Sequence, residues 1–252
     1  MYKIYFIVAS LVSIVLLPLY SIEAVASEEN TVEKNKSNTR LELSYVRTSG
    51  NTDTQTLAGK FTADKEVAAN RYFFSGNVLL EESNGVETSN RLLLEGRFER
   101  VLSGRLFVLL STGYTLDKFS GYKYRLYGGP GAGYDVLDTK KHKLQSLLSF
   151  VYSYDEFSVG DEVSDSYITG KATGKYQYII QENIKLKETV NYLVSFEQTK
   201  KYFLDSETKV ELKINQSLSL GISYLVNYQN LLPSAEVRRT DTTFLTTLIF
   251  AL

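Results

Sequence analysis

The sequence predicts an all-β protein, a single antiparallel transmembrane β-barrel of about 12 strands. Three observations support this fold class. Apolar and polar residues alternate with a period of two along segments of about 9 to 13 residues, and a tilted strand needs about 9 to 11 to cross a membrane. The polar side of these segments carries large charges of both signs. The last residues, 244–252, are an apolar and threonine-rich strand, as expected of a barrel whose last strand closes on its first.

The first element is an export signal. Lys3 precedes an apolar run over residues 4–19, and Ala24-Val25-Ala26 has the small residues of a cleavage site. The alternative is an uncleaved anchor, but the run is shorter than the roughly 20 residues that span a bilayer. We therefore expect a signal peptide over residues 1–26, a flexible polar leader over 27–38 and the barrel over 39–252.

Composition agrees with strands and excludes several function classes. Nineteen Tyr and thirteen Phe with only three Pro favour β-structure. The formal net charge of -1 has no basic excess that would indicate a nucleic-acid partner. Cysteine is absent, which excludes disulfides and structural thiolate metal sites. No cofactor is expected.

The alternation is clearest in the fourth, tenth and eleventh expected strands. Leu92 and Leu94 share one face of the fourth, and Arg91 and Glu95 share the other. Clusters of turn-forming residues separate the remaining segments. In order, the expected strands are 40–48, 54–63, 71–81, 91–99, 105–116, 122–136, 143–154, 167–179, 184–196, 204–214, 217–228 and 242–252.

The connections are expected to alternate in length. Those after the fourth, eighth and tenth strands are tight, whereas 83–89, 155–165 and 229–240 read as longer loops. Short periplasmic turns and longer outer loops have this asymmetry, and an even number of strands places both ends of the barrel on one side.

A soluble lipocalin-like barrel or a sandwich also has one apolar face, and alternation alone leaves that alternative open. Strand length, the mixed charges and the terminal strand favour the membrane barrel. An interfacial girdle of tyrosines is a further expectation. Its members lie toward segment ends: Tyr45, Tyr72, Tyr114, Tyr122, Tyr134, Tyr154, Tyr192, Tyr202 and Tyr228.

Two stretches, 41–61 (LELSYVRTSGNTDTQTLAGKF) and 125–136 (RLYGGPGAGYDV), carry a family resemblance. With the signal peptide and the overall spacing, the chain resembles the family of salt-induced outer membrane proteins, whose function is unknown. The resemblance covers the mature chain and implies an exported outer-membrane barrel, with no settled activity. One departure is the final residue, which is Leu252 where many outer-membrane strands end in an aromatic residue.

Candidate catalytic and metal-binding groups are few. His142 is the only histidine and is expected in a solvated turn, so a Ser/His triad and the usual zinc ligand set are not available. The glycines of 128–133 do not match a phosphate-binding spacing and are expected to let bulky neighbours pack over a strand, with a bulge at Pro130.

Two charged regions lie near the expected outer loops. Five acidic residues could hold a hard divalent cation, although a solvated acidic loop is the better interpretation: Asp155, Glu156, Asp161, Glu162 and Asp165. Six basic residues could pair with lipid phosphates: Lys118, Lys123, Lys200, Lys201, Arg238 and Arg239.

The candidate functional residues are the charges expected to point into the lumen, where opposite charges should pair. Glu81 is expected beside Arg91, and Lys187 is expected to face Glu211. The expected network comprises Arg91, Glu95, Arg97, Glu99, Arg125, Lys171, Lys175, Lys185, Lys187, Glu207, Lys209, Glu211 and Lys213.

These features predict a non-enzymatic protein of the cell outer membrane. A structural or stress-related envelope protein with a narrow charged lumen is the first hypothesis. A small-solute diffusion channel, porin-like and weakly anion-selective, is the second, and an outer-membrane enzyme is a weaker third. Expected partners are outer-membrane lipids and the barrel-assembly machinery during insertion, and the oligomeric state is left open.

Overall fold

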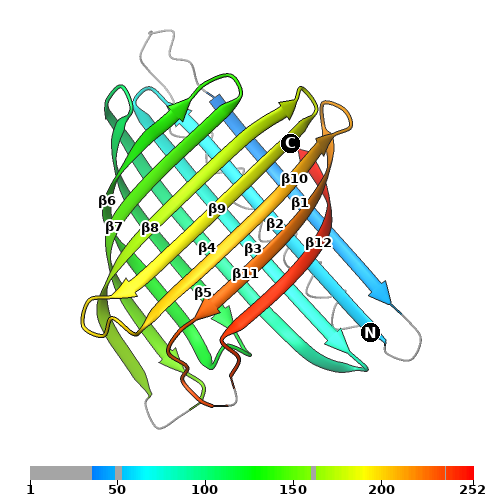
Figure 1. The fold of residues 1–252 in the computed structure, drawn as a ribbon, viewed down its shortest axis with the longest axis vertical. Helices are drawn as coiled ribbons and strands as arrows, with labels where there is room; N and C mark the ends of the chain where they lie inside the picture. The colour runs from blue at the N-terminus through cyan, green and yellow to red at the C-terminus, as the bar shows by residue number, and fades with distance from the viewer. Residues whose placement is uncertain (1–35, 49–52, 160–162, 236) are drawn as a thin grey trace, which may run out of the picture. The chain divides into compact units, whose positions relative to one another are not determined.

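A computed structural model describes residues 36–48, 53–159, 163–235 and 237–252. Twelve antiparallel strands form a closed barrel in which each strand pairs with its neighbours in sequence and β12 pairs with β1 (Figure 1). The expected signal peptide and most of the expected leader lie outside the described residues. The strands are β1 (Lys36–Thr48), β2 (Thr54–Val67), β3 (Asn70–Ser83), β4 (Val86–Ser103), β5 (Leu106–Asp117), β6 (Tyr122–Asp138), β7 (His142–Phe157), β8 (Ser164–Gln181), β9 (Ile184–Ser195), β10 (Tyr202–Lys213), β11 (Leu218–Gln229) and β12 (Thr240–Ala251).

The predicted fold class and the number of strands are confirmed, and most strands extend further than the alternation indicated. The start of β1 and the end of β12 lie at one end of the barrel, here called the short-turn end, with the connections 68–69, 104–105, 139–141, 182–183 and 214–217. The opposite, long-loop end carries the other connections, including 158–163 and 230–239. Among the described residues, no helix has the length and hydropathy needed to cross a membrane.

The expected loop at 83–89 is wrong. β3 and β4 are joined only by Asn84 and Gly85, whose φ angles are 50° and 79°. Both values are positive, as a two-residue turn of the type I′ class requires, and Asn-Gly is the pair that adopts it most readily. A local turn signal therefore determines this hairpin, and Val86 to Ser89 continue the strand.

Among the β6 glycines, Gly133 behaves as expected, but the bulge at Pro130 does not form. The register of β6 against β7 is the same at Gly128 and at Gly131, although residues 129 and 130 make no ladder pair with β7. Proline removes one hydrogen-bond donor, which interrupts the ladder without shifting it. A Cβ atom on Gly133 would lie 2.2 Å from the Phe107 ring, so this glycine does accommodate a bulky neighbour.

The ladder that closes the barrel is short. β1 pairs with β2 along its whole length, from Lys36 to Thr48, but with β12 only from Arg40↔Ala251 to Leu43↔Leu248. The backbone hydrogen bonds that stabilise every other strand pair are therefore fewest at this seam. Side chains inside the barrel span the same seam, as described below.

Aromatic side chains form rows on the outer surface. Near the long-loop end, Tyr124 lies 6.1 Å from Tyr114 and 6.0 Å from Tyr154 between ring centroids, and a second row joins Tyr192, Tyr202 and Tyr228. The expectation that Tyr122 belongs to the girdle of tyrosines is wrong. This residue is 2% exposed and packs with Leu193 and Phe203 inside the barrel, because the register of β6 against β7 shifts between Tyr122 and Tyr124. The shift turns Tyr122 inward, although even-numbered residues further along β6, such as Tyr134, face outward.

Candidate functional site in the barrel lumen

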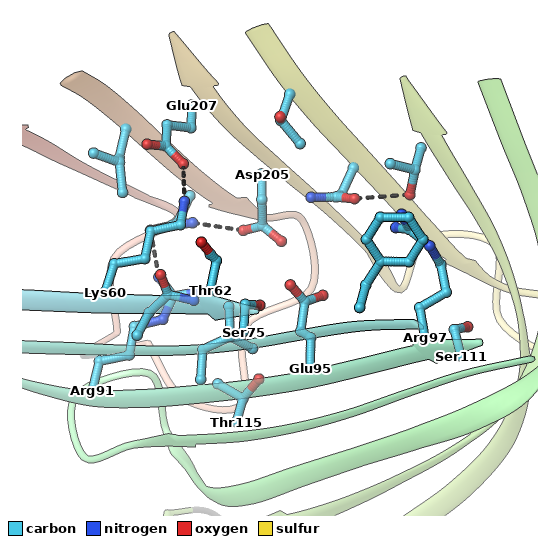
Figure 2. A pocket seen from close by; sticks show the side chains of 18 of the residues that line it. Lys60, Thr62, Ser75, Arg91, Glu95, Arg97, Ser111, Thr115, Asp205 and Glu207 are labelled. Carbon is cyan, nitrogen blue, oxygen red and sulfur yellow. Dashed lines mark hydrogen bonds and ion pairs between the residues drawn. The ribbon is translucent and has the colours of Figure 1, made fainter. Parts of the chain in front are cut away.

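The barrel encloses a cavity of about 440 Å³. Seven basic and six acidic side chains contribute to its lining: Lys60, Arg91, Arg97, Arg125, Lys171, Lys175, Lys209, Glu42, Asp64, Glu95, Asp155, Asp205 and Glu207. Figure 2 shows Glu95 and Asp205 directed toward the same space from opposite walls. The period-two alternation places these side chains, since every second residue of each strand faces the interior.

One group of charges spans the seam and is here called the seam cluster: Arg40, Glu42, Lys60, Lys187, Glu207, Lys209 and Glu211. Its ion pairs connect β10 to β1 and β2 across β11 and β12. Lys209 Nζ lies 2.6 Å from Glu42 and 2.9 Å from Glu207. Lys60 also binds Glu207, at 2.8 Å (Figure 2).

The remaining ion pairs of the seam cluster involve Glu211 and lie nearer the short-turn end. Glu211 accepts from Arg40 at 2.5 Å and from Lys187 at 2.7 Å. Several of the intervening inward residues are small, for example Ser219, Gly221 and Ser223, and the long charged side chains reach past them. Every charge of the cluster has an opposite charge within ion-pair distance, and the cluster reinforces the barrel where its ladder is shortest.

A second group occupies the opposite wall and is here called the central basic cluster: Arg97, Lys171 and Lys175. Lys171, on β8, reaches across three strands to Glu95 on β4, with 3.5 Å between Nζ and the carboxylate. The Tyr127 hydroxyl lies between them, 2.7 Å from Glu95 and 2.6 Å from Lys171. Tyr127 packs where Gly113 has no side chain, since a Cβ there would lie 2.3 Å from its ring.

The other two cations of this cluster are less completely paired. The Arg97 guanidinium carbon lies 4.2 Å from the Phe73 ring centroid, a cation–π contact. Its Nε is 2.8 Å from Glu99, but the contact lacks hydrogen-bond geometry. For Lys175, no carboxylate oxygen among the described residues lies within the 4.0 Å of an ion pair.

Paired groups also narrow each end of the lumen. At the short-turn end, Arg71 bridges Glu99 and Asp135, each at 3.4 Å. At the long-loop end, Asp155 binds Arg125 at 3.1 Å and Lys201 at 3.0 Å, and it accepts from the Tyr167 hydroxyl. Lys201 lies in the β9–β10 connection yet is 4% exposed, so this connection is held against the barrel interior.

Eight of the thirteen expected lumen charges line the cavity: Arg91, Glu95, Arg97, Arg125, Lys171, Lys175, Glu207 and Lys209. Glu99 is fully buried beneath it, and Lys185, Lys187, Glu211 and Lys213 lie toward the short-turn end. Lys187 does bind Glu211, as expected, although the residue directly opposite Glu211 on β9 is Lys185.

The expected neighbours Glu81 and Arg91 share a face of the sheet. Leu79 lies opposite Arg91, and Glu81 follows Leu79 by two residues on the same strand, so both point to the same side. Among the described residues, however, Arg91 is directed to Asn227 and Asp117. Arg91 is long enough to reach the opposite part of the lumen, and the strand register alone does not determine its partner.

Sequence reasoning missed four acidic residues of the lining, namely Glu42, Asp64, Asp155 and Asp205. Asp205 has the same parity as Glu207, and this alternation was the signal that could have identified it. Asp155 was assigned to an acidic loop, but it belongs to β7 and is buried with basic partners. Asp165 binds Lys201 at 2.7 Å, and Asp161 and Glu162 lie outside the described residues.

Lys201 is also misplaced among the basic rim residues, since it binds Asp155 and Asp165 inside. His142, expected in a solvated turn, is instead the first residue of β7. Its ring stacks on Tyr178 at 4.7 Å, and its Nδ1 lies 2.8 Å from the Tyr176 hydroxyl. It is part of the aromatic outer surface at the short-turn end.

A closed antiparallel barrel of twelve strands with a charged interior is the architecture of outer-membrane β-barrel proteins. A family model described as protein of unknown function, DUF481, matches residues 41–252, and the chain belongs to this family. It is 23% identical over 201 residues to the uncharacterized protein YdiY of Escherichia coli strain K12, a match that covers 80% of this chain and 77% of that protein. Among solved structures, the NanC porin aligns with a TM-score of 0.53 at 11% identity, covering 85% of this chain and 100% of that one.

Proposed function

We propose that this protein is a low-conductance channel for small hydrophilic solutes in the outer membrane of a Gram-negative-type envelope. The observation that carries the proposal is the cavity of about 440 Å³ inside the barrel, in whose lining charged and polar residues outnumber apolar ones such as Leu109 and Leu193. A polar lumen within a closed barrel is the arrangement that allows solutes to cross a membrane. The term porin in the name of the NanC structure is consistent with this function.

The outer surface supports the membrane location. Leu148 and Phe150 are each 66% exposed on β7, and Phe244 is 64% exposed on β12. Exposed apolar side chains on this scale suit contact with lipid. The rows of tyrosines near the long-loop end suit an interface between lipid and water. Outer-membrane lipids and, during insertion, the barrel-assembly machinery are the partners we propose.

The pairing of charges supports a narrow passage. Eight-stranded barrels are filled by side chains and 16-stranded porins leave an aqueous channel, so the contents of a 12-stranded lumen determine what passes. Here the link from Lys171 through Tyr127 to Glu95 crosses the interior. Lining charges are almost balanced in sign, so only a weak preference for anions is expected.

A closed structural or stress-related barrel is the second candidate. The contacts of Lys201 with Asp155 and Asp165 favour it, because they hold a connection at the long-loop end inward. An enzymatic role is disfavoured. The single histidine stacks on Tyr178 at the outer surface, away from the lumen.

Two measurements on the full chain test the proposal. Cell fractionation should place a heat-modifiable, protease-resistant species in the outer membrane, and recovery in the soluble periplasm would contradict the location. Single-channel recording of the refolded protein in a planar bilayer should show small, stable steps. Complete absence of current would favour the structural barrel, and large non-selective steps would show that the lumen is open.

A further inference from the structure

The central basic cluster contains a cation for which the barrel supplies no counter-charge at ion-pair distance. Lys175 lines the cavity, and its cross-strand neighbours, Gln145 on β7 and Thr189 on β9, are both neutral. The Gln145 amide donates to Asp135 at 2.9 Å and is therefore engaged elsewhere. A charge held in a confined lumen without a partner is costly, and a ligand of opposite charge would relieve that cost.

Neighbouring cations add to the positive charge around Lys175 that a ligand of opposite charge would neutralise. Arg97 and Lys171 lie within electrostatic range of Lys175, and Glu95 and Glu99 are the acids that oppose them. Glu99 is shared between Arg71 and Arg97, and Glu95 is shared between Lys171 and the Tyr127 hydroxyl. Both carboxylates are thus already engaged, so the positive potential near Lys175 is only partly compensated.

Arg97 is oriented to take part in binding. Its stacking on Phe73 immobilises the guanidinium plane, and its terminal nitrogens have no hydrogen bond to any described residue. A planar guanidinium with free donors matches the two oxygens of a carboxylate or phosphate. Figure 2 shows Arg97 and Glu95 on the wall of the same cavity, with Ser111 beside Arg97.

Neutral polar groups complete the surroundings. On the wall formed by β8 and β9, the Thr173 hydroxyl donates to the Asn191 side-chain oxygen at 2.8 Å, and both residues line the cavity. This bond leaves the Asn191 amide hydrogens available as donors. A small hydrophilic molecule with hydroxyl groups could therefore be bound at its polar end as well as at its charge.

We propose that Arg97 and Lys175 form a binding site for an oxyanion group, a carboxylate or a phosphate, on a small hydrophilic solute. The proposal deepens the proposed channel function, because such a site in the lumen would retain acidic solutes as they pass. Binding itself does not require conduction, so the site can be tested even if the barrel carries no current.

The test is isothermal titration of the refolded full chain in detergent micelles with glucuronate, with its uncharged counterpart glucose and with inorganic phosphate. Glucuronate should bind and glucose should not. Binding of phosphate would show that the oxyanion alone suffices, whereas glucuronate binding without phosphate binding would assign the site to carboxylates. Equal binding of glucuronate and glucose, or binding of neither glucuronate nor phosphate, would overturn the proposal.

Matched variants separate a local site from the summed charge of the lumen. Lys175→Gln should weaken glucuronate binding by at least about tenfold, the loss expected for one charge-assisted hydrogen bond. Lys60→Gln removes the same charge from the same cavity, but Lys60 is already paired with Glu207. It should change the affinity by less than about twofold. Equal losses in both variants would show that only the net charge matters and would refute the site.

In planar bilayers, the same two variants connect the site to transport. Glucuronate should interrupt the current through wild-type channels, and Lys175→Gln should shorten these interruptions. If the titration succeeds and no channel forms, the binding site stands and the proposed function fails. If channels form but the titration shows no binding, the proposed function stands and the binding site fails.

Discussion

The seam cluster and the central basic cluster both direct arginine and lysine side chains into the lumen, but they differ in how completely these charges are paired. Around the seam, Lys209 has two carboxylates within 3.0 Å and Glu211 has two cations. On the opposite wall, Lys175 has no carboxylate at ion-pair distance among the described residues. Paired charges hold strands together, whereas an incompletely paired charge in a cavity is available for a ligand. Charge content alone therefore does not distinguish a structural site from a binding site.

The largest expected effect is on stability and tests whether the two clusters differ in role. Lys209→Met leaves Glu42 without a cation and weakens the pairing of Glu207, and loss of one partner from a buried ion pair costs about 3–5 kcal/mol. Lys175→Met removes a charge that has no such partner and should leave the free energy of unfolding unchanged or raise it. Urea-induced unfolding in lipid vesicles measures both. Similar losses in the two variants would remove the distinction between the clusters.

An intermediate effect concerns the glycines that make room inside the barrel. A Cβ on Gly129 would lie 2.1 Å from the Phe150 carbonyl oxygen, a backbone atom that cannot rotate away. Gly129→Ala should therefore destabilise the barrel by about 1–3 kcal/mol, measured in the same assay. Gly174→Ala is the control, because a Cβ there meets nothing within 4 Å. If Gly129→Ala unfolds like the wild type, the close approach of β6 and β7 is not required.

The smallest expected effect is on ion selectivity. Seven basic and six acidic side chains line the cavity, so Lys175→Gln makes the two numbers equal. The weak anion preference should disappear, as measured by the reversal potential in a potassium chloride gradient. The change should be clearest at low salt, because the Debye length falls from about 10 Å at 0.1 M to about 3 Å at 1 M. A strong cation preference in the wild type would contradict the role given to the central basic cluster.

Local patterns in the sequence were sufficient to predict much of this structure. Alternation along each segment identified twelve strands and the inward side of residues such as Arg97, Lys175 and Lys209. The Asn84-Gly85 turn was also readable from its residues, although a longer loop was expected there. These features depend on neighbours in the chain, and for this reason the sequence by itself determined them.

Only the closed barrel decided which charges are partners. Arg40 and Glu211 are 171 residues apart, and the pair exists because β10 and β1 face the same lumen, with two strands between them. Lys175 lies among similar charges but beside neutral cross-strand neighbours, so it forms no ion pair with a described residue. Long side chains reach across several strands inside a barrel, and their partners depend on curvature and register that no single segment encodes.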